Sequence, residues 1–566
     1  MTTPPRPTIV VRPALVELTD EALAALQASD HGIYLRGRLL VQVARCASDL
    51  RWLTRPRGAP VIVPLTAGRL LDRLDRAAIW ITPGKHARPT TPPRWVADQI
   101  LERLEWPFPL LAGVVEAPTL QPHGTLLSTA GYDAESALLY WPDGEYFLGP
   151  AEPTREDVDT AVAALLDPVQ DFPFVGDKGE AGKAAYIAAT LSLAARHAIS
   201  GPVPAFAIVS PTPGTGKGLL AAVISLIGSG RTPAVMTDVA ERDEMRKRLL
   251  SLAIAGTPVV LLDNLSGVLG SDALAAALTA TEVEDRLLGR SQMVRAPLTS
   301  VWLITGNNLG FKRTLGRRVL PVELDAQVEH PEDRGGFVYD NLLDRVQAQR
   351  RGLVVAALTV LRGYWVAGRP RHGKPRMGSF EAWDDLVRGA CVWAGLTDPA
   401  ATDDPSHGRG RLRAEGDEDL AALGILLAAL TMAFGDQPFT CAQVLTRATT
   451  TDEPLRIALE EAGAADRTGK LTARALGYRF RAVQDRLIDG HKLITERADR
   501  HAKIRLWRID AGAAGDAGYA GDNPSRGDYE QGAPNIPVAK TLFGQRLETS
   551  PPSPASPANE DDALPF

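Results

Sequence analysis

The sequence predicts a multidomain α/β protein, and three observations support this fold class. The chain has 566 residues, enough for three or four domains of about 150 residues each. Hydrophobic residues make up 45% of the chain and charged residues 23%, which is the balance of a packed globular protein. Between residues 166 and 330, short apolar segments alternate with helix-like segments, a pattern typical of βαβ units around a parallel sheet.

The N-terminal and middle domain boundaries follow from changes in the pattern along the chain. Residues 1–165 are expected to form an α+β domain, as either a structural collar or a substrate-recruiting module. Within it we expect a hairpin at 32–41, an amphipathic helix at 95–104 and a turn at 131–133. Residues 331–402 are expected to form a helical extension of the α/β domain.

The rest of the chain divides into three parts. Residues 403–416 are polar and contain Gly and Pro, which predicts a linker. Residues 417–510 are expected to fold as helices followed by strands, with 420–435 as a buried helix. Gly, Ala, Pro, Ser and Asp dominate residues 511–566, which predicts a disordered tail.

Charge is unevenly distributed, although the net charge of the whole chain is only −6. Residues 467–508 contain 12 basic and 4 acidic residues, whereas residues 511–566 contain 3 basic and 8 acidic residues. A basic module is therefore followed by an acidic tail. Three cysteines without a CxxC pair argue against a disulfide scaffold and against a zinc site.

Targeting signals are not evident in the sequence. The N-terminus lacks an apolar signal core. The longest uncharged apolar stretch, residues 420–435, is shorter than the roughly 20 residues that a membrane span needs. We therefore expect a soluble, cytoplasmic protein without a membrane partner.

The strongest motif is the segment Pro-Thr-Pro-Gly-Thr-Gly-Lys-Gly at residues 211–218. An apolar strand is predicted before it and a helix after it, as in a phosphate-binding loop, where backbone N–H groups and the helix N-terminus face a phosphate. Two departures from the motif are Pro211, at the first glycine position, and Gly218, where Ser or Thr would ligate magnesium. The expected nucleotide-binding residues are Pro213, Gly214, Thr215, Gly216, Lys217, Gly218 and Leu219.

Three further polar sites follow the loop within about 100 residues. A buried-type strand at 258–262 ends in Asp263, which is placed to hold a magnesium ion. A third strand at 300–304 is followed by Asn307, whose amide is placed to orient an attacking water. Arg317 and Arg318 precede another strand and are candidates for a finger that reaches a neighbouring subunit's nucleotide.

This order of motifs resembles that of the superfamily 3 helicases of the AAA+ class, and it is most similar to the ATPase part of phage and plasmid primase–helicase proteins. The resemblance covers about residues 185–330. It implies a central P-loop AAA+-like ATPase that assembles as a hexameric ring around DNA and uses ATP and Mg²⁺. The implied catalytic residues are Lys217, Asp263, Asn264, Asn307, Arg317 and Arg318.

Asn264 departs from the resemblance, because many relatives have an acidic residue there to polarise water. Glu241 and Glu244 on the preceding segment are alternative carboxylates, although their spacing from basic residues favours a solvated, paired helix face.

Two basic segments are expected to contact DNA. Residues 285–295 lie where such helicases have a hairpin that faces the DNA channel, and residues 467–508 predict a basic helix followed by a hairpin, as in a winged-helix-like domain. A generic basic surface or a subunit-docking domain is the alternative for the second segment. The expected contact residues are Arg286, Arg290, Arg295, Arg474, Arg479 and Arg481.

The C-terminal tip is similar to that of bacterial single-stranded-DNA-binding proteins. It contains Asp561, Asp562, Leu564, Pro565 and Phe566, and an acidic tether with a terminal aromatic anchor suits a basic pocket on a host replication protein. A chance ending of an acidic tail is the alternative.

Three functional hypotheses follow. The first is an ATP-dependent DNA helicase or translocase for replication of a phage, plasmid or integrative element. The second is a nucleotide-switched DNA-binding initiator, loader or regulator that does not unwind DNA. The third, part of a primase–helicase, is disfavoured because residues 1–165 contain no acidic triad of the kind that holds metal ions in primases.

Overall fold

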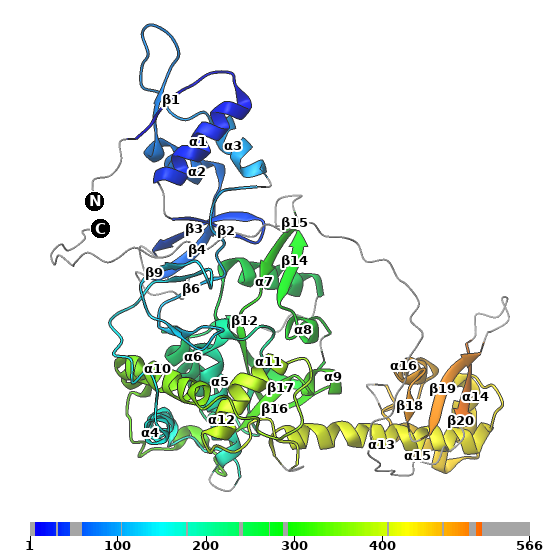
Figure 1. Ribbon diagram of the computed structural model, residues 1–566. Helices are drawn as coiled ribbons and strands as arrows, with labels where there is room; N and C mark the ends of the chain where they lie inside the picture. Colours follow the sequence, from blue (N-terminus) through cyan, green and yellow to red (C-terminus); the bar gives the residue numbers. More distant parts are fainter. Residues whose placement is uncertain are drawn as a thin grey trace, which may run out of the picture. The chain divides into compact units, whose positions relative to one another are not determined.

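In the computed structural model (Figure 1), one region of the chain holds a central sheet with helices on both faces. The structure describes residues 6–29, 32–45, 59–103, 105–176, 179–236, 242–270, 272–286, 293–403, 407–466, 469–488, 490–496 and 505–511. Within this described part of the chain, none of the helices combines the length and apolar character needed to cross a membrane.

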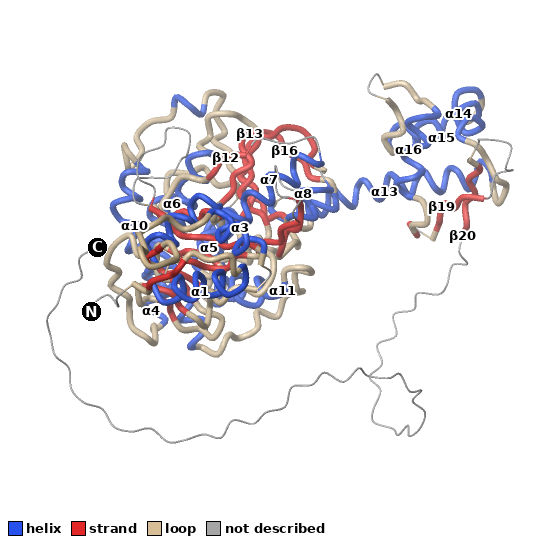
Figure 2. The backbone as a smooth tube through the Cα atoms, turned by 90° about the horizontal axis from the view of Figure 1, so that it is seen from above, coloured by secondary structure: helices blue, strands red, loops and turns tan. Residues whose placement is uncertain are grey.

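The central sheet has five parallel strands in the order β12-β13-β16-β11-β17. The chain leaves β11 for the far edge at β12, returns through β13 and β16, and then adds β17 on the other side of β11. Ligands of open α/β sheets bind at such a reversal, outside the carboxyl ends of the strands. Strands β12, β13 and β16 can be followed in Figure 2. The bounds are β11 (Ala205–Ser210), β12 (Ala234–Met236), β13 (Val259–Leu269), β16 (Val301–Phe311) and β17 (Val319–Glu323).

Alternate residues of each strand pack into different cores, as the two-residue period of a strand requires. On β11, Phe206 and Ile208 face one core, whereas Ala205 and Ala207 face the other. Helices α5 (Glu180–Ala194), α6 (Lys217–Ser229) and α10 (Leu342–Val366) cover the first face. Helices α7 (Arg242–Ala255), α8 (Asp272–Ala277) and α9 (Arg313–Gly316) cover the second. The predicted α/β class is confirmed.

Strands β13 and β16 extend beyond the predicted strand ends. Leu262 pairs with Ile304 and Leu265 with Gly306, so Asp263 and Asn264 together lie opposite Thr305. This arrangement is a β-bulge, a feature common beside active sites because it re-aims a side chain. Asp263 therefore lies at a bulge within β13, and the prediction that the strand ends there is wrong.

The described residues of the N-terminal module form helices α1 to α4 and several small sheets. The predicted hairpin at 32–41 is confirmed as β2–β3, and the predicted helix at 95–104 as α3. The predicted turn at 131–133 is wrong, because these residues form β9 and pair with β10. The bounds are β1 (Thr8–Val10), α1 (Leu15–Ser29), β2 (Ile33–Arg36), β3 (Leu39–Arg45), β4 (Pro60–Pro64), α2 (Ala67–Ala77), β5 (Ile79–Ile81), α3 (Arg94–Glu102), β6 (Gly113–Val115), β7 (Thr119–Leu120), β8 (Leu126–Leu127), β9 (Gly131–Asp133), β10 (Leu138–Tyr140) and α4 (Arg155–Leu166).

The N-terminal module shares two cores with the α/β region. Leu120 of β7 and Leu165 of α4 pack in the same core as β11. The guanidinium of Arg36 is buried and donates to Ala253 O on α7 at 2.7 Å and to Ala112 O at 2.6 Å. Burial lowers the pKa of Arg36 to about 10.

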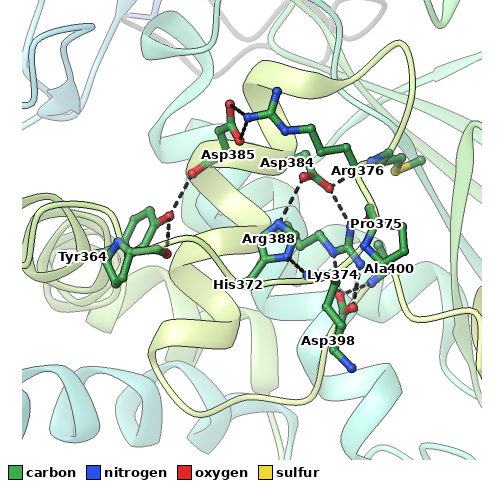
Figure 3. Close-up of polar contacts among 12 residues, drawn as sticks. Tyr364, His372, Lys374, Pro375, Arg376, Asp384, Asp385, Arg388, Asp398 and Ala400 are labelled. Carbon is green, nitrogen blue, oxygen red and sulfur yellow. Dashed lines mark hydrogen bonds and ion pairs between the residues drawn. The ribbon is translucent and has the colours of Figure 1, made fainter. Parts of the chain in front are cut away.

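The helical extension contains a buried cluster of charged side chains (Figure 3). Arg388 donates to Asp384 Oδ1 at 2.7 Å and to Asp398 Oδ2 at 2.6 Å, while His372 Nε2 lies 3.1 Å from Asp384 Oδ2. Asp384 and Arg388 begin and end one π-helical turn, so the turn places both side chains in the cluster. The segment consists of α11 (Glu381–Trp383), the π-helical turn η5 (Asp384–Arg388) and α12 (Gly389–Trp393).

The C-terminal module has a separate hydrophobic core around Leu427, Phe480 and Trp507. Its helices are followed by a three-stranded antiparallel sheet, so the predicted order of helices and then strands is confirmed. The predicted linker at 403–416 is wrong from Gly408 onward, because the first helix begins there. The bounds are α13 (Gly408–Phe434), α14 (Cys441–Thr450), α15 (Glu453–Glu461), α16 (Ala473–Val483), β18 (Leu487–Ile488), β19 (His491–Glu496) and β20 (Leu506–Ala511).

Candidate functional site

The segment 211–218 forms a tight loop between β11 and α6. Gly214 and Gly216 have φ of +77° and +90°, a region that glycine adopts at low cost. Gly216 caps the N-terminus of α6, and Lys217 is the first residue of that helix. The loop and the helix N-terminus therefore have the local geometry of a phosphate cradle.

The ammonium group of Lys217 is held inside the loop. It donates to Thr212 O at 3.0 Å and to Thr215 Oγ1 at 3.1 Å. Partial burial lowers the pKa of Lys217, because desolvation disfavours the charged form. An anion beside the ammonium group would favour its charged form and so raise the pKa of Lys217.

The sheet brings Asp263 and Asn307 to the same edge as the loop. Asn307 on β16 pairs with Ser210, the last residue of β11, and also with Ser266 on β13. Thr305 links the strands, since its hydroxyl donates to Asp263 Oδ1 at 2.5 Å and accepts from Asn264 N–H at 2.9 Å. Asn307 thus lies on the strand between the loop strand and the Asp263 strand.

Two buried polar atoms at this edge lack a partner in the described part of the chain. They are Asn307 Oδ1 and Thr212 Oγ1. Buried polar groups in proteins are nearly always satisfied, so such atoms indicate a place for a ligand or water. Asn308, the neighbour of the predicted residue, instead donates its amide N–H to Pro211 O at 3.2 Å and so fastens β16 to the loop.

The donor set fits a magnesium ion only together with a nucleotide. No group of three or more His, Cys, Asp or Glu among the described residues could hold a metal. Asp263 would supply one carboxylate, and the remaining ligands would come from phosphate oxygens and water, as Mg²⁺ commonly arranges them. Gly218 offers no side-chain oxygen, and a Cβ at its position would meet nothing within 4 Å.

Of the two alternative carboxylates for polarising water, one is described and lies in an ion pair on α7. Glu244 pairs with Arg248 at 3.3 Å, one helical turn away, as the solvated-face interpretation predicts. Glu241 lies outside the described residues. Asn264 is exposed with φ of +54°, a left-handed conformation that asparagine tolerates.

A pocket of about 510 Å³ adjoins the other side of the loop. It contains Phe172, Phe337 and Tyr339 together with Gly214 and Gly216 of the loop. A Cβ on Gly214 would lie 2.6 Å from Glu332 Oε2, so the short 3₁₀ helix Pro331–Asp333 contacts the loop directly. An aromatic pocket beside a phosphate cradle suits a nucleobase, and sequence reasoning missed it because its two segments are about 160 residues apart, as the Asp171–Arg334 contact shows.

Arg317 and Arg318 lie at the amino-terminal ends of the strands, whereas the loop lies at their carboxyl ends. Ala205 N–H, at the start of β11, donates to Arg318 O at 3.0 Å, whereas the loop follows Ser210 at the end of that strand. Five strand residues span about 17 Å. Neither arginine is therefore placed beside the loop of its own subunit. Burial and the neighbouring Arg317 charge lower the pKa of Arg318.

The two strands of the predicted hairpin are present, but their described residues include three acidic and only two basic side chains. Strands β14 (Glu282–Arg286) and β15 (Met293–Pro297) pair antiparallel. Arg295 is ion-paired with Glu282 at 2.6 Å, while Arg286 is exposed. Arg290 lies outside the described residues.

Helix α16 presents part of the predicted basic surface. Arg474 and Arg481 are exposed, whereas Leu476 and Phe480 are buried in the module core. Tyr478 is 74% exposed and has the Arg481 guanidinium 5.1 Å from its ring centroid. Residues 474, 478 and 481 share one helix face because they are four and three residues apart. Arg479 is half-buried, and the tail residues Asp561, Asp562, Leu564, Pro565 and Phe566 lie outside the described part of the chain.

Comparisons with known proteins found similar solved structures but no relative by sequence. No protein-family model matches the chain, and no curated protein matches its sequence. The A-form apo structure of the NrS-1 C-terminal region is 11% identical with a TM-score of 0.33, over 75% of this chain and 92% of that chain. The JCV helicase structure is 14% identical with a TM-score of 0.19, over 42% of this chain and 66% of that chain. With scores below 0.5, the functional inference rests on the residues described above.

Proposed function

We propose that the protein is an ATP-dependent DNA helicase or translocase. The observation that supports this most strongly is the gathering of Lys217, Asp263 and Asn307 at one sheet edge, beside two unsatisfied buried polar atoms. Three separate sequence segments supply these residues. If segment 211–218 were only a glycine-rich turn, there would be no reason for Asp263 and Asn307 to lie beside it.

Each residue has a chemical role in this proposal. The Lys217 ammonium would exchange its bonds to Thr212 O and Thr215 Oγ1 for phosphate oxygens. Asp263, oriented by the Thr305 hydroxyl, would hold Mg²⁺ with phosphate and water as its other ligands. Asn307 would orient the attacking water through Oδ1. The aromatic pocket would take the base of ATP.

The arginine pair supports an oligomeric motor. Arg317 and Arg318 are at the wrong edge for their own nucleotide site, so a catalytic role requires a neighbouring subunit. A closed ring is the ordinary outcome of head-to-tail contacts, and a hexamer around DNA is the proposed state. The β14–β15 hairpin, with Arg286 and Arg290, and the α16 face would contact the DNA.

Strand displacement on a forked DNA duplex tests the proposal. ATP-dependent release of the displaced strand is expected for the wild type and is expected to be lost in Lys217→Ala. An exposed-lysine variant, Lys85→Ala, serves as the control and should unwind normally. ATP binding without any displacement would contradict the helicase assignment.

The second candidate is a nucleotide-switched DNA-binding protein that does not unwind DNA. Two observations favour it: Gly218 lacks the magnesium-ligating hydroxyl, and Asn264 stands where a carboxylate would polarise water. This candidate predicts ATP-dependent DNA binding or assembly with little turnover. Template-dependent primer synthesis would identify the third candidate, a primase–helicase.

A further inference from the structure

A second pocket, of about 590 Å³, lies far from the phosphate loop. Gly230 and Arg231, which directly follow the C-terminal end of α6, form one wall of this pocket. Helix α6 has 13 residues and begins at Lys217, so about 20 Å of helix separates the two sites. The other walls come from the end of β3, the start of β4, the segments that follow β6 and β10, and α10. The pocket therefore lies between the N-terminal module and the α/β region.

The pocket is strongly basic. Four arginines line it, together with only two acidic residues. Glu116 pairs with Arg231, and Asp143 pairs with Arg350. The other two arginines, Arg45 and Arg351, are exposed and have no carboxylate partner among the described residues. The lining therefore has a net charge of about +2, which favours an anion.

Arg350 supplies a buried donor without a partner. The residue is 2% exposed, donates from Nε to Leu226 O at 3.0 Å and from Nη1 to Asp143 and to Tyr146 Oη at 2.6 Å. Its Nη2 is buried and has no hydrogen-bond acceptor among the described residues. Nη2 lies 3.3 Å from the position that a Cβ on Gly230 would take, so it is at the pocket wall. An unsatisfied guanidinium N–H in a basic pocket calls for an acceptor such as a phosphate oxygen.

An aromatic surface adjoins the basic groups. The guanidinium of Arg45 lies over the Trp141 ring, 5.0 Å from its centroid. Nucleobases stack on aromatic rings and on the planes of arginine guanidinium groups. The pocket volume lies within the range of roughly 300–1,000 Å³ that is usual for small-molecule sites.

We infer that this pocket binds a phosphorylated nucleotide unit, with the phosphate at Arg350 and Arg351 and the base stacked on the Arg45–Trp141 pair. The unit could belong to a single strand of nucleic acid or to a free nucleoside phosphate, since both present the same base and phosphate. The inference does not rest on the proposed motor function, because it concerns binding at a site that the phosphate loop does not contact.

The test uses the full chain in a Lys217→Ala background, so that the phosphate loop is silenced. The variant is Arg45→Ala/Arg351→Ala, because both side chains are exposed and their loss leaves the fold intact. The matched control is Arg88→Ala/Arg94→Ala, which removes two exposed arginines of the N-terminal region outside the pocket. Fluorescence anisotropy measures the binding of labelled oligothymidylate and, separately, of a labelled free adenosine nucleotide at several salt concentrations.

We expect the pocket variant to bind one of these probes at least tenfold more weakly than the control. For the oligonucleotide, the slope of log affinity against log salt should fall by about 0.7, since Arg351 is the phosphate contact that this variant loses and each single-strand phosphate contact contributes about 0.7. Weakened oligonucleotide binding would assign the site to a single strand, and weakened free-nucleotide binding would assign it to a nucleoside phosphate. Equal binding of both probes by the pocket variant and the control would overturn the inference. Failure of Lys217→Ala to affect ATP binding would count against the proposed function alone.

Discussion

At the scale of single residues, Thr305 joins two neighbouring strands at the candidate nucleotide site. Its hydroxyl donates to Asp263 and accepts from the backbone N–H of Asn264. The bulge in β13 places both of these residues opposite Thr305. One hydroxyl therefore fixes the direction of the carboxylate that is proposed to hold magnesium.

Replacing Thr305 with valine tests this role. The side chain keeps its shape but loses the hydrogen bond to a charged group, a bond worth about 1.5–3 kcal/mol. We expect kcat for ATP hydrolysis to fall by about tenfold or more, with nucleotide affinity changed less than twofold. Thr359→Val is the control, because that hydroxyl bonds to Val355 O within its own helix, α10. Equal loss of turnover in both variants would argue against a specific role for Thr305.

Residue identities at the site were partly predictable from the sequence. Asp263 and Asn307 could be named because polar residues after apolar strands gather at one edge of a parallel sheet. Thr305 could not, since its role depends on a bulge between residues that are 41 positions apart. Asn307 and Asn308 are adjacent in sequence, but Asn307 pairs with Ser266 on β13, whereas the Asn308 side chain bonds Pro211 of the loop. Only the strand register distinguishes the two.

At the scale of elements, the π-helical turn Asp384–Arg388 stabilises the helical extension through buried charges (Figure 3). Burial alone would raise the pKa of Asp398, but hydrogen bonds from Arg388 and the Ala400 N–H lower it overall. A carboxyl with a lowered folded-state pKa stabilises the fold above its ordinary value of about 3.9. This contribution is lost as the pH falls through the lowered value.

Arg388→Met should therefore destabilise the protein in a pH-dependent way. We expect a loss of about 3–5 kcal/mol at pH 7, because the variant leaves the buried Asp398 carboxylate without its ion-pair partner. The difference from wild type should shrink below about pH 4, as Asp398 becomes protonated. Urea unfolding at pH 7 and at pH 3.5 measures both. The control is Arg376→Met, an exposed arginine paired with Asp385 at 2.9 Å, which should cost less than about 1 kcal/mol. A pH-independent loss would contradict this account of the cluster.

The exposed face of α16 supports a second element-scale prediction. We expect Arg474→Ala/Arg481→Ala to weaken binding of duplex DNA at least tenfold and to reduce the salt slope by about 1.8. Electrophoretic mobility shifts at several salt concentrations provide the measurement. Arg447→Ala/Arg456→Ala removes the same charge from α14 and α15, where both arginines pair with carboxylates. Equal weakening by both pairs would point to a generic basic surface.

Elements with a regular pattern were predictable, whereas the start of α13 was not. The glycines at 408, 410 and 416 predict a linker, since each costs about 1 kcal/mol in a helix. Contacts distant in sequence outweigh that cost: Arg411 bonds Glu323 at 2.7 Å, and Leu412 is buried. Local propensity contains no information about such partners.

At the scale of the whole molecule, the position of Arg317 and Arg318 predicts complementation between subunits. Lys217→Ala and Arg317→Ala/Arg318→Ala should each abolish ATP turnover alone. In an equal mixture, about a quarter of the subunit interfaces would combine an intact loop with intact arginines, if subunits assemble at random. We expect the mixture to recover activity to about that fraction, measured by phosphate release. No recovery in a mixture shown to co-assemble would contradict an arginine finger that acts between subunits.

The joining of the N-terminal module to the α/β region lay beyond sequence reasoning. Arg36 looks like an ordinary strand residue, yet its guanidinium bonds the carbonyl oxygen of Ala253, 217 positions later. Leu165, at the predicted domain boundary, packs in the central core. Periodicity can assign a residue to a strand or helix, but it cannot say which distant element covers it.

The most direct test of the central claim is steady-state ATP hydrolysis with and without single-stranded DNA, in the wild type and in Lys217→Ala. An ATP-driven DNA motor predicts turnover that rises with DNA and disappears in the variant. Nucleotide binding without turnover would replace the motor with a nucleotide switch. Absence of nucleotide binding in the wild type would contradict both, and with them the assignment of the Lys217 loop as a phosphate site.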